Sequence, residues 1–301
     1  MYLNCHSYYS LRYGTIKPER LLAISSKNGI QTLALTDINN TSASLDFVRL
    51  SEKYEVKPVL GVDFRNGAQQ QFVLLAKTNR GFQNINIYLS AFLHDSSLKI
   101  PEQAPQLEDT FVIYPYNHGE TYNLKSNEFL GIKPQDLNKL KFSKWNNFRS
   151  KLVVLQTVSF ENKKGFNTHR LLRAIDNNTL LSKLSKTEQG KETDVMLPYD
   201  ELCETYQEFP EILKNTETIL GHCDIAFDFS QDIPNNQKSY TKSEAEDYKL
   251  LKKLTYSGLS YRYENPNEVI YKRIEKELDI IKQKGFVSYF LINWRILEYA
   301  R

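Results

Sequence analysis

The sequence predicts an α/β fold, with a largely parallel sheet or barrel over residues 1 to about 160 and helices after it. Short apolar runs alternate with helical patterns through the first part of the chain, which is typical of β-α-β units. After Phe160 the strand patterns end, and helical stretches joined by polar connectors follow. We therefore expect the later helices to pack against the α/β unit.

The first helix is predicted over residues 17–29. Pro18 suits its first turn, Leu21 and Leu22 supply an apolar face, and Gly29 suits the C-cap. The next segments continue the alternation, with a strand at 30–37, a helix at 41–55 and a strand at 56–64. Further apolar runs predict strands at 71–78, 110–115, 127–132 and 151–160, and helical patterns lie between them near 80–93 and 134–148.

Two domains are predicted, with a boundary near residue 230. The segment 228–244, DFSQDIPNNQKSYTKSE, contains Pro234 and two asparagines and has little apolar content, which is typical of a linker. Residues 1–230 are therefore assigned to the α/β unit with its closing helices. Residues 231–301 are assigned to the linker and a separate helical part.

The last part of the sequence is helical. Apolar side chains recur at helical spacing before Gly285, at Ile270, Ile274, Leu278 and Ile281. Residues 286–301 are mostly apolar, and such a helix calls for a partner, so we expect the chain to be an excised N-terminal piece of a longer protein. The alternative is a terminal helix that folds back on its own domain.

Composition excludes several classes of protein. Lysine and arginine (39) nearly balance aspartate and glutamate (36), and a net charge of +3 marks no surface-wide nucleic-acid footprint. The three cysteines lie far apart in no CxxC pair, which argues against a disulfide framework or zinc ribbon and indicates a reducing cytoplasm. The sequence has no signal-peptide pattern and no apolar run near the roughly eighteen residues that span a bilayer.

Common nucleotide-binding and hydrolase motifs are absent from the sequence. It contains no GxGxxG after a strand, no GxxxxGK[ST] loop and no GxSxG elbow. Tyrosines beside Arg12 could stack on bases, and the basic face of the 267–285 helix could touch phosphates. Core packing and a solvated, charge-balanced helix are the commoner explanations of these two features.

Polar residues at the carboxyl ends of the predicted strands form the candidate site. Asn4 and His6 are two residues apart on an extended segment and therefore share a face. Asp37 and Asp63 lie at the ends of the next two strands, and Gln71 begins the run after them. Imidazole and carboxylate bind zinc or manganese well, whereas a neutral amide is a weak ligand, so His6, Asp37 and Asp63 are the candidate metal ligands.

Structural roles remain open for Asp37 and Asp63. The segment TDINNT is also typical of Asp37 capping the next helix or its turn, and Asp63 before RNG also suits a solvent-edge residue beside a turn. The remaining histidines form no HxH, HxxxH or HExxH pair, so surface or capping roles are expected for His94, His118, His169 and His222.

An ordered set of segments carries a family resemblance: LNCHSYYSLRYGTIKPERLL, LALTDINNTSASLDFVRL, KPVLGVDF and FVLLAKTNRGFQNIN. In this order they resemble the polymerase and histidinol phosphatase (PHP) domain at the N-terminus of bacterial DNA polymerase III alpha subunits, which are C-family polymerases. HRLLRAIDNNTLLSKL and FPEILKNTETILGHCDIAFDF look like the helices that close that region. RIEKELDIIKQKGFVSYFLINWRILEYA resembles the opening of the polymerase core, so the resemblance covers nearly the whole chain.

The resemblance implies a distorted (β/α)7 PHP barrel with appended helices. Residues 231–301 would then hold the linker and a truncated N-terminal part of the polymerase core, a short helical segment from the start of the palm. In active members of the family the strand ends hold a metal cluster that hydrolyses phosphoesters, including 3′–5′ proofreading.

This sequence departs from the family's metal-binding pattern. Asn4 stands where the first motif, HxH, has its first histidine, and Ile38 stands where a histidine follows the retained Asp37. Asp63 stands in place of a glutamate. We expect no catalytic residue in this chain, only a residual pocket that comprises Asn4, His6, Asp37, Asp63, Gln71, Thr157 and Ser159.

The resemblance further implies the N-terminal piece of a replicative DNA-directed DNA polymerase, a nucleotidyltransferase that uses Mg²⁺. This piece would lack the magnesium ligands and be inactive itself, with a degenerate PHP domain as scaffold and docking site for the proofreading exonuclease subunit. The expected partners are the rest of the polymerase core and primer–template DNA in the cytoplasm, with no membrane. The alternative is an active PHP phosphoesterase or 3′–5′ exonuclease, with Zn²⁺ or Mn²⁺ on His6, Asp37 and Asp63.

Overall fold

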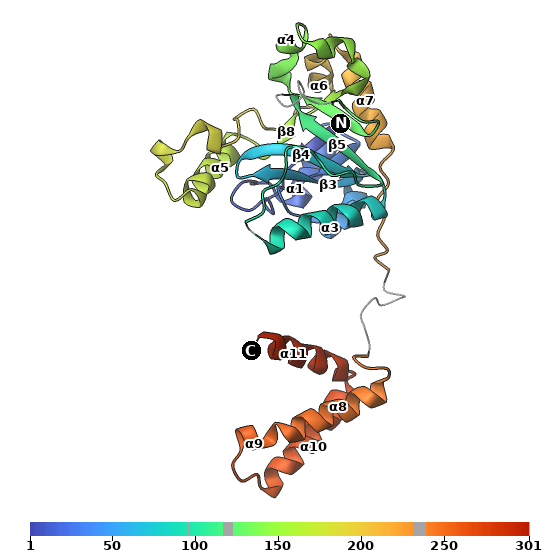
Figure 1. Cartoon of the computed structure of the whole chain (residues 1–301), viewed down its shortest axis with the longest axis vertical. Helices are drawn as coiled ribbons and strands as arrows, with labels where there is room; N and C mark the ends of the chain where they lie inside the picture. Colours follow the sequence, from blue (N-terminus) through green and yellow to red (C-terminus); the bar gives the residue numbers. More distant parts are fainter. Residues whose placement is uncertain (96, 117–122, 231–238, 301) are drawn as a thin grey trace. The chain divides into compact units, whose positions relative to one another are not determined.

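The computed structural model describes residues 1–95, 97–116, 123–230 and 239–300. They form two compact units, Met1–Phe229 and Ser230–Arg301, shown in Figure 1. Residues 231–238 of the predicted linker lie outside the described ranges, as does His118.

The first unit is built on one eight-stranded sheet in the order β7-β6-β5-β4-β3-β2-β1-β8. Its strands are β1 (Tyr2–Cys5), β2 (Thr32–Leu35), β3 (Lys57–Asn66), β4 (Gln69–Ala76), β5 (Thr110–Pro115), β6 (Glu128–Ile132), β7 (Leu152–Val154) and β8 (Thr157–Val158). Strand β4 is antiparallel to both of its neighbours, β3 and β5, and the other pairings are parallel. The α/β prediction is therefore confirmed, with one antiparallel strand inside a mostly parallel sheet.

The two ends of this sheet meet in one continuous run of chain. Strand β7 pairs with β6 at one end of the sheet, and β8 pairs with β1 at the other. Only Leu155 and Gln156 separate β7 from β8, so the sheet curls round until its ends adjoin. The single predicted run 151–160 thus supplies both β7 and β8, which is why the seven runs expected of a (β/α)7 barrel give eight strands.

Alternate residues along the strands separate into two buried clusters. The outer cluster contains Leu33, Leu60 and Val62, and the inner one contains Ala34 and Val59. Period-two alternation of this kind is the pattern of a curled sheet with a filled interior and a covered exterior.

Helices cover the outer face of the sheet, as Figure 1 shows for α3 (Asn79–His94). The other N-terminal helices are α1 (Pro18–Lys27) and α2 (Ser44–Ser51), followed by the 3₁₀ helix η1 (Glu52–Tyr54). Pro18 begins α1, and the side chains of Leu21 and Leu22 are fully buried, as predicted from their spacing.

The 134–148 segment is less helical than predicted. It contains η3 (Pro134–Asp136), α4 (Leu137–Leu140) and η4 (Lys144–Asn147), with η5 (Arg149–Lys151) after it. The Ser143 hydroxyl donates to the Leu140 carbonyl at 3.0 Å and so ends the turn of α4, because serine offers the backbone a local alternative to the helix.

The helices after Phe160 close the unit. They are α5 (Lys163–Asp176), η6 (Leu181–Lys183), η7 (Lys186–Glu188), α6 (Tyr199–Thr205) and α7 (Pro210–Gly221). From the end of α7, Ile219 and Leu220 join the inner cluster, and the Lys57 ammonium at the start of β3 donates to the Gly221 carbonyl at 3.4 Å. Helix α7 therefore covers the amino ends of the parallel strands and leaves their carboxyl ends to polar residues.

The second unit is all helical within its described residues. It contains α8 (Glu244–Ser257), α9 (Leu259–Arg262), α10 (Glu268–Gln283) and α11 (Val287–Ala300). Its own core is formed by Leu251, Leu278, Val287 and Leu291. Across the described part of the chain, no helix combines the length and apolar character that a membrane span requires.

Candidate functional site

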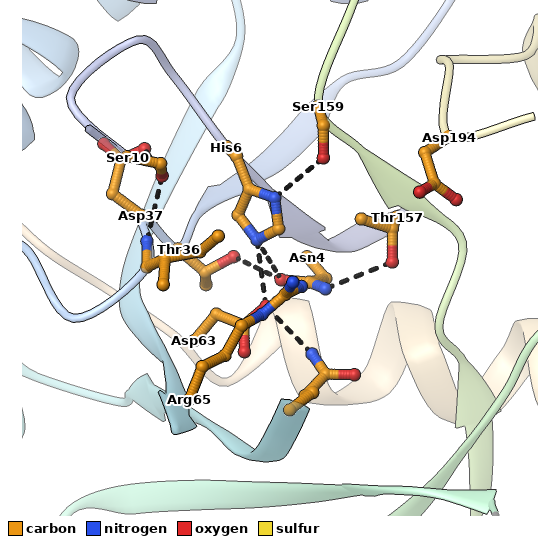
Figure 2. Close-up of polar contacts among 12 residues, drawn as sticks. Asn4, His6, Ser10, Thr36, Asp37, Asp63, Arg65, Thr157, Ser159 and Asp194 are labelled. Carbon is orange, nitrogen blue, oxygen red and sulfur yellow. Dashed lines mark hydrogen bonds and ion pairs between the residues drawn. The ribbon is translucent and has the colours of Figure 1, made fainter. Parts of the chain in front are cut away.

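Polar side chains converge at the carboxyl ends of the barrel strands, where Figure 2 shows them linked by hydrogen bonds. Asn4 lies on β1 and His6 directly follows it, while Asp63 and Arg65 come from β3 and Thr157 from β8. All five side chains are at most 6% exposed. Because buried polar groups are unfavourable unless paired, the hydrogen-bond partners decide what this pocket can bind.

His6 uses both ring nitrogens on protein partners. Its Nε2 lies 3.0 Å from Asn4 Oδ1 and 2.9 Å from Asp63 Oδ2, which are both acceptors, so Nε2 carries the proton. Its Nδ1 lies 2.9 Å from the Ser159 hydroxyl. In the neutral ring, Nδ1 therefore accepts from Ser159, and no lone pair of His6 points to a vacant ligand position.

Asp63 concentrates its contacts on one oxygen. Its Oδ2 accepts from His6 Nε2, from Arg65 Nε at 3.0 Å and Nη2 at 2.7 Å, and from Gln70 Nε2 at 2.9 Å. Its Oδ1 is buried with no partner among the described residues. Burial opposes the charged form, but the Arg65 guanidinium and the His6 contact hold the pKa of Asp63 well below its usual range. Asp63 is thus a buried anion, not a solvent-edge residue.

Arg65 lies in the pocket although the sequence did not predict it as a site residue. Its guanidinium lies over the Tyr13 ring, 4.9 Å from the centroid, while its Nε and Nη2 hold Asp63. Burial alone would lower the pKa of Arg65, but Asp63 raises it, so the side chain stays a cation in the pocket. The available signal was Asp-x-Arg on a strand, since residues two apart share a face.

Asp37 lies on a neighbouring loop and faces away from Asp63. Its Oδ1 accepts from the Ser7 N–H at 2.6 Å and the Ser10 hydroxyl at 2.7 Å, and its Oδ2 accepts from the Ser7 hydroxyl at 2.7 Å. Burial raises the pKa of Asp37 against these hydrogen bonds. The carboxylate thus stabilises the turn after β1, so its structural role is in that turn and not at a helix N-cap.

The remaining predicted residues occupy different positions. The Asn4 amide donates to Thr157 Oγ1 at 3.2 Å, and the Thr36 hydroxyl donates to Asn4 Oδ1 at 3.1 Å. The Gln71 amide donates to the Gln69 carbonyl at 3.2 Å. A register shift in the β3–β4 pairing between Phe64 and Arg65 brings Gln70 to Asp63 in its place.

His169 departs from the surface or capping role that its isolation predicted. It is fully buried, its Nδ1 lies 2.7 Å from the Tyr13 carbonyl, and its Nε2 accepts from the Gly190 N–H at 2.8 Å. Burial lowers the pKa of His169 to about 4. The histidine joins α5 to the loop beside the pocket, which is a long-range contact that local sequence does not encode.

The residues present do not fit the metal cluster of active PHP domains. Both nitrogens of His6 and both oxygens of Asp37 are occupied by protein groups, and a guanidinium lies on Asp63. Within residues 1–95, 97–116, 123–230 and 239–300, no three His, Cys, Asp or Glu side chains are grouped as metal ligands. A permanent cation from the protein instead balances the buried carboxylate.

Family models match part of each unit. Residues 3–129 match the PHP domain, and residues 249–301 match the bacterial DNA polymerase III alpha NTPase domain. Residues 3–129 are therefore similar to PHP domains, and residues 249–301 are similar to part of a bacterial DNA polymerase III alpha domain. The resemblance that the ordered segments predicted is therefore confirmed.

Curated relatives match the whole chain at low identity. An error-prone DNA polymerase of Symbiobacterium thermophilum is 24% identical over 348 residues, covering 100% of this chain and 32% of the relative. DNA polymerase III alpha subunits of Halalkalibacterium halodurans and Bacillus subtilis are 24% and 25% identical, each covering 100% of this chain and 30% of the relative. The chain thus spans about a third of the length of these relatives.

Proposed function

We propose that this chain is the N-terminal region of a replicative DNA polymerase in which the PHP domain is a non-catalytic scaffold. The observation that carries the proposal is the Arg65–Asp63 pair, with His6 bonded to the same carboxylate oxygen. A guanidinium is always charged in proteins, so Arg65 already supplies the positive charge that balances the buried Asp63 carboxylate. The pocket then stabilises the strand ends and does no hydrolysis.

The activity of the whole protein is part of the same proposal. The polymerase would transfer nucleotides to a primer end with Mg²⁺ bound outside this chain, as a cytoplasmic protein whose partners are the rest of the polymerase core and primer–template DNA. The PHP scaffold would also dock a separate proofreading exonuclease subunit. Residues 231–301 would link the scaffold to the polymerase core.

Metal content tests the scaffold proposal. The 301-residue chain, purified without chelator, is analysed for zinc, manganese and iron by inductively coupled plasma mass spectrometry. We expect well under one ion per chain. Two or more stoichiometric ions per chain would sink the proposal.

The second candidate is an active metal-dependent phosphoesterase or 3′–5′ exonuclease, with Zn²⁺ or Mn²⁺. It is favoured by two buried acceptors without partners among the described residues, Asp63 Oδ1 and Gln70 Oε1. Its test is release of nucleotides from a 3′-labelled oligonucleotide with added Mn²⁺. Loss of that activity in Asp37→Ala, together with retention in Asp46→Ala on the exposed α2 surface, would establish it.

A further inference from the structure

A groove lies at the other end of the barrel from the polar pocket, between α7 and the first residues of β5 and β6. Its volume is about 380 Å³. Its lining includes three apolar side chains and several polar ones, among them Phe111, Phe129, Ile219, Lys77, Thr218 and His222. Neither the scaffold role nor the polymerase reaction uses a residue of this groove.

The floor of the groove is aromatic. The Phe111 and Phe129 rings meet edge to face, with their centroids 5.9 Å apart. Phe111 belongs to the inner cluster of the barrel, and Phe129 packs against that cluster. Because this floor is part of the barrel core, it is already formed before a partner arrives, which lowers the entropic penalty of binding.

Lys77 places a positive charge over this floor. Its ammonium lies 4.2 Å from the centroid of the Phe111 ring. The Lys77 N–H donates to the Asp109 carbonyl at 2.8 Å, and the Lys77 carbonyl accepts from the Asp224 N–H at 2.7 Å, so the backbone is fixed on both sides. Within the described part of the chain, the ammonium itself has no hydrogen-bond or ion-pair partner.

Two neighbouring lysines are engaged by the protein itself. The Lys151 ammonium donates to the Ser126 carbonyl at 3.1 Å and to the Glu128 carbonyl at 3.3 Å. The Lys57 ammonium donates to the last carbonyl of α7 at 3.4 Å. Lys77 differs from both, because its donors are free among the residues described.

No acidic side chain offsets Lys77 within the groove. Among the described residues that line it, Lys77 and His222 can carry positive charge and none has a carboxylate. His222 Nδ1 lies 2.6 Å from the Thr218 carbonyl, so Nδ1 carries a proton and donates. The groove therefore favours an occupant with a negative charge.

The exposed side of the groove indicates what kind of occupant it fits. Thr218 and His222 are exposed, so an occupant would keep one side in solvent. A small molecule in its own site usually buries more than about 70% of its surface. An aromatic floor with a polar rim instead matches protein interfaces, in which an apolar anchor fills a pocket and polar groups surround it.

We propose that this groove binds a short segment of a partner protein in which an apolar side chain stands next to a carboxylate. The apolar side chain packs on Phe111 and Phe129, and the carboxylate accepts from the Lys77 ammonium. This interaction goes beyond the proposed function. Its failure would leave the metal-free scaffold unaffected, because the two sites share no residue.

Peptide display tests the proposal. A library of random short peptides on phage is selected against the 301-residue chain, and an enriched peptide is labelled with fluorescein and titrated by fluorescence anisotropy. We expect the enriched peptides to share an acidic residue beside leucine or an aromatic residue. Lys77→Met should weaken binding roughly tenfold or more, because a charge-assisted contact is lost. Lys77→Arg should stay within about threefold of the wild type, since the charge over the ring is kept.

A second variant blocks the groove without changing its charge. Thr218→Trp adds a large side chain on the exposed side of α7 and should weaken binding of the same peptide roughly tenfold or more. The matched control is Lys214→Met, which removes an exposed lysine of α7 that does not line the groove and should bind like the wild type. Circular dichroism checks the folding of each variant, and Thr218→Trp decides if Lys77→Met does not fold.

Two results would overturn the proposal. The first is a selection that yields no peptide, or only peptides whose binding neither Lys77→Met nor Thr218→Trp weakens. The second is dimerisation of the chain in sedimentation velocity that Thr218→Trp abolishes, because the groove would then bind a second copy of this chain.

Discussion

At the scale of residues, the pocket is organised around a single carboxylate oxygen. Asp63 Oδ2 accepts four hydrogen bonds from His6, Arg65 and Gln70, and a guanidinium supplies the positive charge. A buried ion pair of this kind gives little net stability compared with apolar residues, but it becomes very unfavourable when one partner is removed. The pocket is therefore sensitive to loss of Arg65 in particular.

Arg65→Met is expected to lower the free energy of unfolding by about 3–5 kcal/mol, because Asp63 stays buried and charged without its cation. The double variant Arg65→Met/Asp63→Asn should recover a large part of the loss. The matched control, Arg49→Met, breaks an exposed pair with Asp46 and should change stability by less than about 1 kcal/mol. Urea denaturation provides the measurement, and equal effects of Arg65→Met and Arg49→Met would contradict the expectation.

His169 predicts a dependence of stability on pH. Its pKa is lowered to about 4 by burial, whereas an unfolded histidine titrates near about 6.5. The unfolded chain therefore binds a proton that the folded chain does not, and stability present above the unfolded pKa is lost as the pH falls toward 4. The free energy of unfolding is expected to fall by something on the order of 3 kcal/mol over this pH range.

His169→Gln should remove this part of the pH dependence, because the amide can replace both hydrogen bonds and does not titrate. The comparison is urea denaturation of wild type and variant at neutral and acidic pH. His222→Gln, at an exposed histidine, serves as the control and should keep the wild-type slope. If the free energy of unfolding of His169→Gln falls as steeply as that of the wild type between about pH 6.5 and 4, the assignment of this pH dependence to His169 is refuted.

At the scale of elements, the barrel interior sets the limits on side-chain size. A methyl group added at Gly131 of β6 would lie 2.7 Å from the Leu155 side chain and 2.9 Å from Ile113 Cγ2. Gly61 of β3 would meet the Leu74 carbonyl at 2.1 Å. These glycines let neighbouring strands curl around the inner cluster.

Gly131→Ala is expected to destabilise the first unit by about 1–3 kcal/mol, because the added methyl overpacks the interior. Gly221→Ala at the end of α7 is the control, since its new methyl meets nothing within 4 Å. It should leave stability unchanged or raise it by up to about 1 kcal/mol. Thermal unfolding, monitored by circular dichroism, gives the midpoint temperature of each variant. Equal midpoint temperatures for Gly131→Ala and Gly221→Ala would argue against a tightly packed interior.

The elements were largely predictable because local patterns determine them. Helix α1 and the strands β1 to β6 follow from apolar periodicity and from Pro18 and Gly29. The division of 151–160 between two sheet ends was not predictable, because Leu155 and Gln156 mark no break in the sequence. The antiparallel direction of β4 also depends on tertiary pairing that a single sequence does not specify.

The site was predictable only in part. The strand-end positions predicted His6 and Asp63, and the family resemblance added Thr157; the structure brings these three residues together. It missed Arg65 and Gln70, because a register shift and long-range pairing decide which side chains face Asp63. The surface role expected of His169 was wrong for a similar reason, since its partners Tyr13 and Gly190 lie far away in sequence.

At the scale of the whole molecule, each unit has its own hydrophobic core. The first unit contains the inner and outer barrel clusters, and the second contains the cluster of Leu251, Leu278, Val287 and Leu291. The sequence has two tryptophans, Trp145 in the first unit and Trp294 in the second. Each unit therefore carries its own fluorescent reporter.

Leu278→Ala is expected to destabilise the second unit by about 2–5 kcal/mol, since it removes a buried side chain from that core. The variant is made in two chains, each of which keeps only one tryptophan. In these chains, Leu278→Ala should shift the urea midpoint reported by Trp294 more than the midpoint reported by Trp145. Ile212→Ala, in the core of the first unit, should give the opposite order. Identical shifts of both reporters for both variants would show that the units unfold as one.

The adjoining ends of the sheet have a consequence for synthesis on the ribosome. Strand β1 lies between β2 and β8, and Asn4 is 153 residues from its partner Thr157. At translation rates of roughly 5–20 residues per second, β1 waits on the order of ten seconds for that partner to be made. Until then the nascent chain exposes an unpaired strand edge, which is a template for aggregation during this interval.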